Sequence, residues 1–118
     1  MNPLLDVKDL SVRYHMGRRQ PAVDEVSFAV EAGSTLGIIG ESGAGKTTLA
    51  QALAGLIDSA TAKVTGAIVL DGLDLLTLHE AELCRVRGSG VSMIFQDASG
   101  SLDPSMPVVS QVAEAIMM

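Results

Sequence analysis

The sequence predicts an α/β fold, because short apolar strands, glycine-rich turns and helix-forming segments follow one another along its 118 residues. The first observation is a glycine-rich loop at residues 40–47, which stands between an apolar run at 35–39 and a helix-forming run at 49–57. The second is the strand-like patterning of residues 4–14 and 26–30. We therefore expect a buried strand that leads into the loop. The helix after it is apolar on almost every face and is expected to be central and buried.

The other expected elements flank the loop on both sides. In the first strand, the residues expected to face inward are Leu5, Val7 and Val12. Later in the chain we expect a loop at 58–63, a strand at 66–70, a helix at 77–87, a strand at 91–95, a polar loop at 97–107 and a helix at 108–118. Asp71 and Gly72 form a turn signal, and Thr77 is expected to cap the helix that starts there, together with Glu80.

The composition is that of a globular domain with an aliphatic core. Hydrophobic residues make up 47% of the chain, charged residues 19% and aromatic residues 3%. The net charge of −6 argues against broad nucleic-acid binding, which needs a basic surface, but it leaves local phosphate binding open. Cys84 is the only cysteine, so no intrachain disulfide can form, and we expect a buried or half-buried structural thiol. No apolar run reaches the ~20 residues that a membrane span requires.

The loop from Gly40 to Thr47 carries the clearest chemical signal in the chain. It fits G-x-x-x-x-G-K-[ST] at every fixed position. In this pattern the glycines let backbone N–H groups turn toward phosphate oxygens, and the helix that follows adds further N–H groups and a favourable dipole. Lys46 is expected to neutralise charge on the β- and γ-phosphates, and the Thr47 hydroxyl to bind Mg²⁺. The alternatives are a glycine-rich turn without a ligand and a purely capping role for Thr47.

Four stretches carry a family resemblance when they are taken in order. They are Gly40–Thr48, Leu10–Tyr14, Gly66–Gly72, and Arg87-Gly88 followed by Met93–Asp97 and Ser101–Pro104. Together they resemble the ATP-binding subunits of ABC transporters, and the nearest branch looks like the peptide and nickel importers. The loop alone indicates only a P-loop NTPase, whereas the ordered set spans nearly the whole chain and is much more specific.

The resemblance implies a fold, a ligand and a set of site residues. The fold is a P-loop NTPase core with an antiparallel β-region, and the ligand is ATP with Mg²⁺. Tyr14 would stack on the adenine ring, with a half-buried strand tyrosine as the alternative. The residues expected to contact the nucleotide are Tyr14, Gly40, Ser42, Gly43, Ala44, Gly45, Lys46, Thr47 and Thr48. Lys46 and Gln96 would serve catalysis, and Thr47 and Gln96 would be the metal ligands.

The resemblance also implies partners and a location. In this family two ATP-binding subunits, identical or different, sandwich ATP and drive transmembrane permease subunits. The resemblance thus implies an ATP hydrolase that powers import of peptides, nickel or a related solute. It would be cytoplasmic and peripheral on the cytoplasmic face of the cell membrane, without a nucleic-acid partner.

The chain departs from the family pattern in lacking the motifs of the family's second half. It has no Leu-Ser-Gly-Gly-Gln signature, no switch histidine and no strand ending in Asp-Glu. Asp71 follows an apolar strand, but Gly72 stands where the catalytic glutamate would be, so a turn is favoured over a metal ligand. The last helix shows no stop signal, so we expect residues 1–118 to be a single partial domain, truncated before the helical signature subdomain is complete.

For these residues alone, the expected function is ATP binding with negligible hydrolysis. The motivating observation is the missing water-orienting glutamate and the missing signature. Two alternatives remain open at this point. One is a small P-loop kinase, which would need an acceptor site and a basic lid. The other is a non-catalytic fragment that binds a nucleotide or a membrane partner without turnover.

Overall fold

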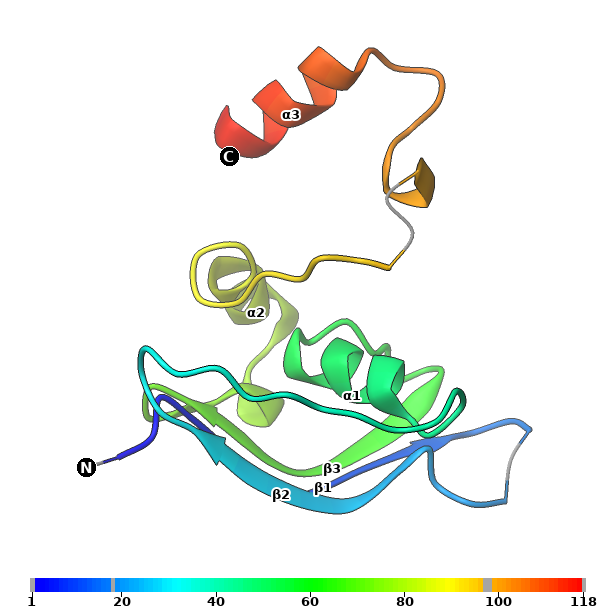
Figure 1. Cartoon of the computed structure of the whole chain (residues 1–118), viewed down its shortest axis with the longest axis vertical. Helices are drawn as coiled ribbons and strands as arrows, with labels where there is room; N and C mark the ends of the chain where they lie inside the picture. Colours follow the sequence, from blue (N-terminus) through cyan, green and yellow to red (C-terminus); the bar gives the residue numbers. More distant parts are fainter. Residues whose placement is uncertain (1, 18, 97–98, 118) are drawn as a thin grey trace.

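The computed structural model of the chain describes residues 2–17, 19–96 and 99–117. Figure 1 shows a twisted sheet, with α1 and α2 above one of its faces and α3 at the far end of the molecule. The elements in chain order are β1 (Leu5–Tyr14), β2 (Val23–Val30), α1 (Lys46–Leu53), β3 (Ala62–Leu70), β4 (Leu73–Asp74), η1 (Leu75–Thr77), α2 (Glu80–Val86), η2 (Ser99–Ser101) and α3 (Val108–Met117). The predictions for residues 97, 98 and 118 lie outside the described residues.

The four strands form one antiparallel sheet in the order β2-β1-β3-β4, which matches the antiparallel β-region implied by the resemblance. The register between β1 and β3 shifts between Lys8 and Ser11. Asp9 lies in this shift with a left-handed φ of 49°, as in a β-bulge. Opposite the bulge, a Cβ on Gly66 would lie 2.5 Å from the carbonyl oxygen of Asp9, so the close approach of the two strands requires glycine.

The hydrophobic core lies between the sheet and α1. Its most deeply buried side chains are Val7, Leu10, Val12 and Ile68. Leu49 and Ala52 of α1 join the same cluster. Val7 and Val12 were predicted to face inward, and Leu5 is half-buried beside them. Leu10 is 0% exposed although the alternation did not predict it, because the bulge at Asp9 shifts the strand by one residue and turns Leu10 toward the core.

Two predicted strands are wrong. Residues 35–39 run as an irregular segment, and no strand among the described residues pairs with them. Ile39 is 96% exposed. Residues 91–95 form only an isolated bridge between Arg87 and Val91, and Ile94 is 97% exposed. The physical reason is the same in both cases, since a buried parallel strand exists only where neighbouring strands complete its hydrogen bonds.

Helix α1 is shorter and less buried than predicted. It ends at Leu53, because Gly55 adopts a left-handed φ of 69° and turns the chain away. Within α1 only Leu49 and Ala52 are buried. The expectation of a helix buried on almost every face is therefore wrong, since α1 covers the sheet with one face only.

The segment before α2 also differs from prediction in detail. The helix begins at Glu80 and not at Thr77, and the backbone N–H of His79 donates to the Glu82 carboxylate at 3.0 Å. The predicted Thr77 cap is wrong, because residues 75–77 form the short helix η1, in which Asp74 Oδ1 accepts the Leu76 N–H at 3.1 Å. Residues 71 and 72 connect β3 to β4 and form the predicted turn, with both φ angles positive.

Helix α3 forms where it was predicted and is exposed along its length. Val109 and Ile116 are among its exposed apolar side chains, and no residue of α3 is buried. Gln111 fixes its start to the preceding loop, since its amide donates to the carbonyl of Asp103 at 2.9 Å. Among the helices that the structure describes, none has the length and apolar character to cross a membrane.

Candidate nucleotide-binding site

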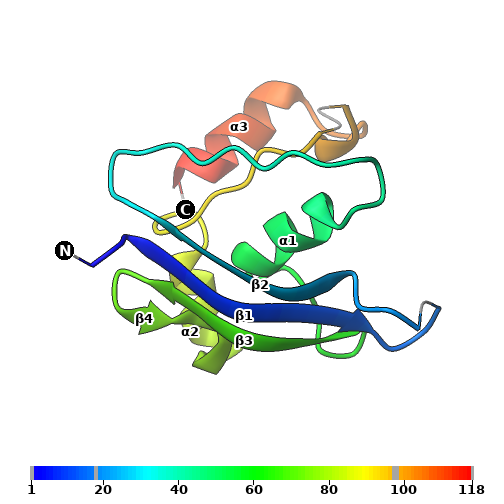
Figure 2. The same ribbon diagram turned by 60° about the horizontal axis from the view of Figure 1, so that its bottom comes forward.

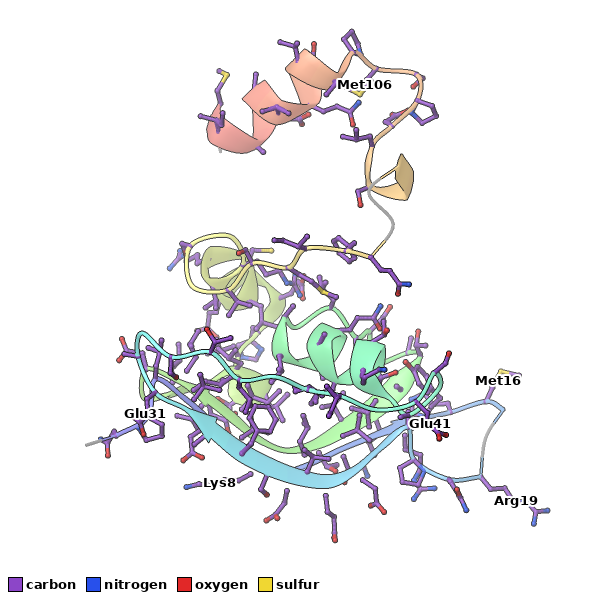
Figure 3. The ribbon with its side chains drawn as sticks, in the orientation of Figure 1. Lys8, Met16, Arg19, Glu31, Glu41 and Met106 are labelled. Carbon is purple, nitrogen blue, oxygen red and sulfur yellow. The ribbon has the colours of Figure 1, made fainter. Side chains whose placement is uncertain are left out.

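A cavity of about 580 Å³ opens where the loop after β2 enters helix α1. Figures 1 and 2 place this loop and the β1–β2 loop at the same end of the sheet, and Figure 3 shows Glu41 at that end with Met16 and Arg19. The residues that line the cavity are Tyr14, Ala22, Ser42, Gly43, Gly45, Lys46, Thr47, Thr48 and Gln96. All of these except Ala22 were predicted site residues, so the fold gathers residues that lie far apart in the sequence.

Two predicted site residues, Gly40 and Ala44, do not line the cavity. The Gly40 carbonyl oxygen accepts a hydrogen bond from the Lys46 ammonium. The Ala44 N–H donates to the Glu41 carbonyl at 3.1 Å and closes a turn within the loop. Both residues therefore shape the loop around the cavity.

Gly45 joins the loop to the helix and must be glycine. Its φ is 99°, and a Cβ at this position would lie 2.2 Å from the carbonyl oxygen of Ala22. The Gly45 carbonyl accepts the N–H of Leu49 at 2.9 Å, which starts α1. The loop therefore packs directly against the backbone just before β2. Ala22 is the one lining residue that the sequence did not reveal, because an alanine has no chemical signature.

The first turn of α1 provides the positive end of a helix dipole at the cavity. An α-helix leaves its first N–H groups without intrahelical acceptors, and here they belong to Lys46, Thr47 and Thr48. No acidic residue lies in this turn to neutralise the dipole. With the Lys46 ammonium beside them, these donors form an arrangement that suits an anion such as a phosphate group.

Tyr14 and Thr48, two of the lining residues, are joined by a hydrogen bond. Tyr14 is the last residue of β1, and its side chain is half-buried. Its hydroxyl oxygen lies 3.1 Å from Thr48 Oγ1, and either hydroxyl can donate. The aromatic ring is therefore placed beside the helix that follows the loop, next to the residues expected to hold phosphate.

Within the described part of the chain, the cavity lining contains one amide and no carboxylate. Gln96 is exposed and reaches the cavity from the segment that follows α2. Thr47 and Gln96 could each give Mg²⁺ one neutral oxygen ligand. The negative charge that Mg²⁺ also needs would have to come from a bound phosphate. Among the described residues, no cluster of three or more histidine, cysteine or acidic side chains could hold a metal ion.

The perturbed ionisable groups of the described chain lie outside this cavity. The pKa of Glu80 is lowered by a hydrogen bond from Arg87 and by its charge, with Arg87 Nη1 2.6 Å from Glu80 Oε1. The same hydrogen bond raises the pKa of Arg87, which also donates to the carbonyl of Gly55 and so ties α2 to the end of α1. Cys84 lies next to this ion pair and is exposed, so the prediction of a buried or half-buried thiol is wrong.

A second cavity, of about 660 Å³, lies beside this ion pair. Its walls come from the end of α1, from the segment between α1 and β3, from β3, from η1 and from α2, and most of the lining residues are aliphatic. The sequence did not predict it, because its lining residues carry no motif that points to a ligand.

Comparisons with known proteins agree with this geometry. A family model described as ABC transporter matches residues 23–116. The chain is 45% identical over its whole length to the oligopeptide transport ATP-binding protein OppD of Haemophilus influenzae, covering 36% of that protein. It is 43% identical over 98% of its length to OppD of Escherichia coli, covering 34% of that protein. It is 41% identical over 97% of its length to the dipeptide transport ATP-binding protein DppD of Lactococcus lactis, covering 33% of that protein. The chain thus spans about a third of the length of these curated relatives.

Proposed function

Because the chain belongs to the ABC transporter family, we propose that it binds ATP as the nucleotide-binding part of a peptide importer. The observation that carries this proposal is the cavity at the start of α1, in which the loop, Lys46 and Tyr14 come together. Relatives named as oligopeptide and dipeptide transport ATP-binding proteins support the choice of a peptide as the solute.

In this proposal the lining residues divide the nucleotide between them. The β- and γ-phosphates would lie against the N–H groups of the first turn of α1, with Lys46 supplying the positive charge. Thr47 and Gln96 would complete the Mg²⁺ shell together with phosphate oxygens and water. Tyr14 would stack on the adenine ring. Bound Mg²⁺ would neutralise charge on the phosphates.

We propose that this chain alone hydrolyses ATP negligibly. Hydrolysis requires a group that orients the attacking water and charges that stabilise the transition state. Among the residues that the structure describes, no aspartate or glutamate lines the cavity, and Gln96 is the only lining amide. The chain covers only about a third of each relative, so the residues that complete the site in those proteins are not compared with it.

The partners and location follow as proposals from family membership. The chain would act with transmembrane permease subunits and with a second ATP-binding subunit, at the cytoplasmic face of the membrane. The net charge of −6 supports the expectation that nucleic acid is not a partner. The comparisons favour the transporter over a small kinase, and no observation on the described residues favours a kinase.

Calorimetric titration with Mg-ATP tests the binding proposal. Lys46→Ala should weaken ATP binding roughly 10- to 100-fold, because a hydrogen bond to a charged group contributes about 1.5–3 kcal/mol. Lys63→Ala is the matched control, since Lys63 is exposed on β3 and does not line the cavity. Equal affinity of the parent and Lys46→Ala, or no binding to the folded parent, would contradict the proposal. Steady-state ATPase activity that disappears in Lys46→Ala would contradict the claim of negligible hydrolysis.

A further inference from the structure

The hydrogen bond between Tyr14 and Thr48 joins two elements that are each fixed independently. The end of β1 is held by β3, where Tyr14 lies opposite Ala62 and the N–H of His15 donates to the Thr61 carbonyl at 3.1 Å. Helix α1 is held by its buried residues on the core side. The two hydroxyl oxygens, 3.1 Å apart, therefore connect a strand end and a helix start that lie 34 residues apart in the sequence.

From this geometry we infer that Thr48 is a positioning residue, whose hydroxyl holds the Tyr14 ring in place for a purine base. This inference rests on the proposed function, because it assumes that the cavity takes ATP. It gives the Thr48 side chain a role separate from its backbone N–H, which belongs to the phosphate end of the cavity. The hydroxyl would act through Tyr14 and not on the phosphates.

The Tyr14 hydroxyl is not needed for stacking itself. Stacking on a base needs only an aromatic face, so phenylalanine would provide the same face as tyrosine. Tyr14 is half-buried, and it packs against the edge of the hydrophobic core. The bond to Thr48 fixes the hydroxyl end of the ring, so less side-chain freedom remains to be lost when a ligand stacks on it.

The alternative is that the Thr48 hydroxyl contacts a phosphate directly. Two ligands distinguish the possibilities, because ATP carries a base and inorganic tripolyphosphate does not. If the hydroxyl positions Tyr14, its loss weakens ATP binding and leaves tripolyphosphate binding unchanged. If the hydroxyl contacts phosphate, its loss weakens the binding of both ligands.

The experiment measures the affinity of the 118-residue chain for ATP and for tripolyphosphate, each with Mg²⁺, by calorimetry. Tyr14→Phe and Thr48→Val should each lower ATP affinity roughly three- to tenfold, because ordering one side chain on binding costs about 0.5–1.5 kcal/mol. The double variant should lose no more than either single variant, because both changes remove the same bond. Thr48→Ser restores the hydroxyl and should recover the ATP affinity. Thr65→Val, on the exposed part of β3, is the matched control for the change of threonine to valine.

The outcomes separate this inference from the proposed function. Additive losses in the double variant, an equal loss of tripolyphosphate affinity, or unchanged ATP affinity in Tyr14→Phe would overturn the positioning role and leave ATP binding intact. A folded parent chain that binds neither ligand would overturn the proposed function and the positioning role together. Far-UV circular dichroism checks that each variant is folded, and Tyr14→Phe keeps the test decisive if Thr48→Val does not fold.

Discussion

Replacing Gly45 by alanine should disturb both the fold and the cavity, whereas the same replacement at Gly43 should only strain the backbone. Both glycines have left-handed φ angles, 99° at Gly45 and 85° at Gly43. An alanine in this region costs about 1–2 kcal/mol of folding free energy at either position. The two sites differ in their surroundings, because a Cβ at Gly43 meets nothing within 4 Å, while at Gly45 it would lie 2.2 Å from the Ala22 carbonyl oxygen.

The overlap at Gly45 sets the larger magnitude. A Cβ and a carbonyl oxygen need a separation of roughly 3.2 Å, so the backbone at Ala22 or at Gly45 must move by about 1 Å. Overpacking of this kind typically costs a further 1–3 kcal/mol. We therefore expect Gly45→Ala to lower the free energy of unfolding by about 2–5 kcal/mol, and Gly43→Ala by about 1–2 kcal/mol. Because Ala22 and Gly45 both line the cavity, Gly45→Ala should also weaken ATP binding.

Urea unfolding followed by circular dichroism measures the stability difference, and calorimetric titration with Mg-ATP measures binding. Gly66→Ala provides a useful third variant, since a Cβ there would also meet backbone atoms, but at the β-bulge and outside the cavity lining. It should destabilise the fold like Gly45→Ala, while ATP affinity of the folded fraction stays close to that of the parent. Equal stability of Gly45→Ala and Gly43→Ala would refute the argument from the Ala22 contact.

Two further predictions concern the core and the ion pair. Leu10→Ala should lower the free energy of unfolding by about 2–5 kcal/mol, because Leu10 is 0% exposed, whereas Leu73→Ala, at a site 46% exposed, should cost much less in the same urea titration. Arg87 lowers the folded-state pKa of Glu80, so this pair stabilises the fold above the ordinary glutamate pKa of about 4.3 and the stabilisation is lost as the pH falls through the folded-state value. The urea midpoint of the parent should therefore fall more steeply below about pH 4.3 than the urea midpoint of Glu80→Gln. Glu114→Gln, on the exposed helix α3, is the control and should follow the parent. Parallel pH profiles of the parent and Glu80→Gln would contradict this prediction.

The parts of the fold that depend on local chemistry could be predicted from the sequence. The strand β1, the part of β3 from Gly66 onward, the turn at Asp71-Gly72, the start of α1 and the position of α3 all follow from patterns within a few residues. The start of β3 at Ala62 was not predicted, because a loop was expected at 58–63. The lining of the cavity was also largely predictable, because the motif fixes its loop residues and the family resemblance adds Tyr14 and Gln96. Ala22 was not predictable, since an alanine has no chemical signature.

The burial of Leu10 was missed for a different reason. The predicted inward residues Leu5, Val7 and Val12 already break a strict period of two, but the position of the break was not predicted. The bulge at Asp9 is that break, and it puts Leu10 on the same face as Val12. The sequence does contain an indirect signal, because Gly66 lies inside a strand, where a glycine often marks a bulge or a close backbone approach. A glycine inside one strand can therefore indicate that the inward and outward faces switch in the strand that pairs with it, as they do in β1 opposite Gly66.

The segments 35–39 and 91–95 show where local patterns stop being sufficient. Their apolar composition suits a strand buried on both faces, yet such a strand needs partners on both sides for its hydrogen bonds. The first segment leads directly into the loop at Gly40, and the second leads into Gln96. Neither segment belongs to the sheet that the structure describes, so strand pairing does not fix the separation between the loop and Gln96. In contrast, Gly45 packs against the Ala22 carbonyl, and Tyr14 is hydrogen-bonded to Thr48 of α1. Lys46, Thr48 and Tyr14 should consequently govern ATP affinity in this chain, and replacing Gln96 should change it less.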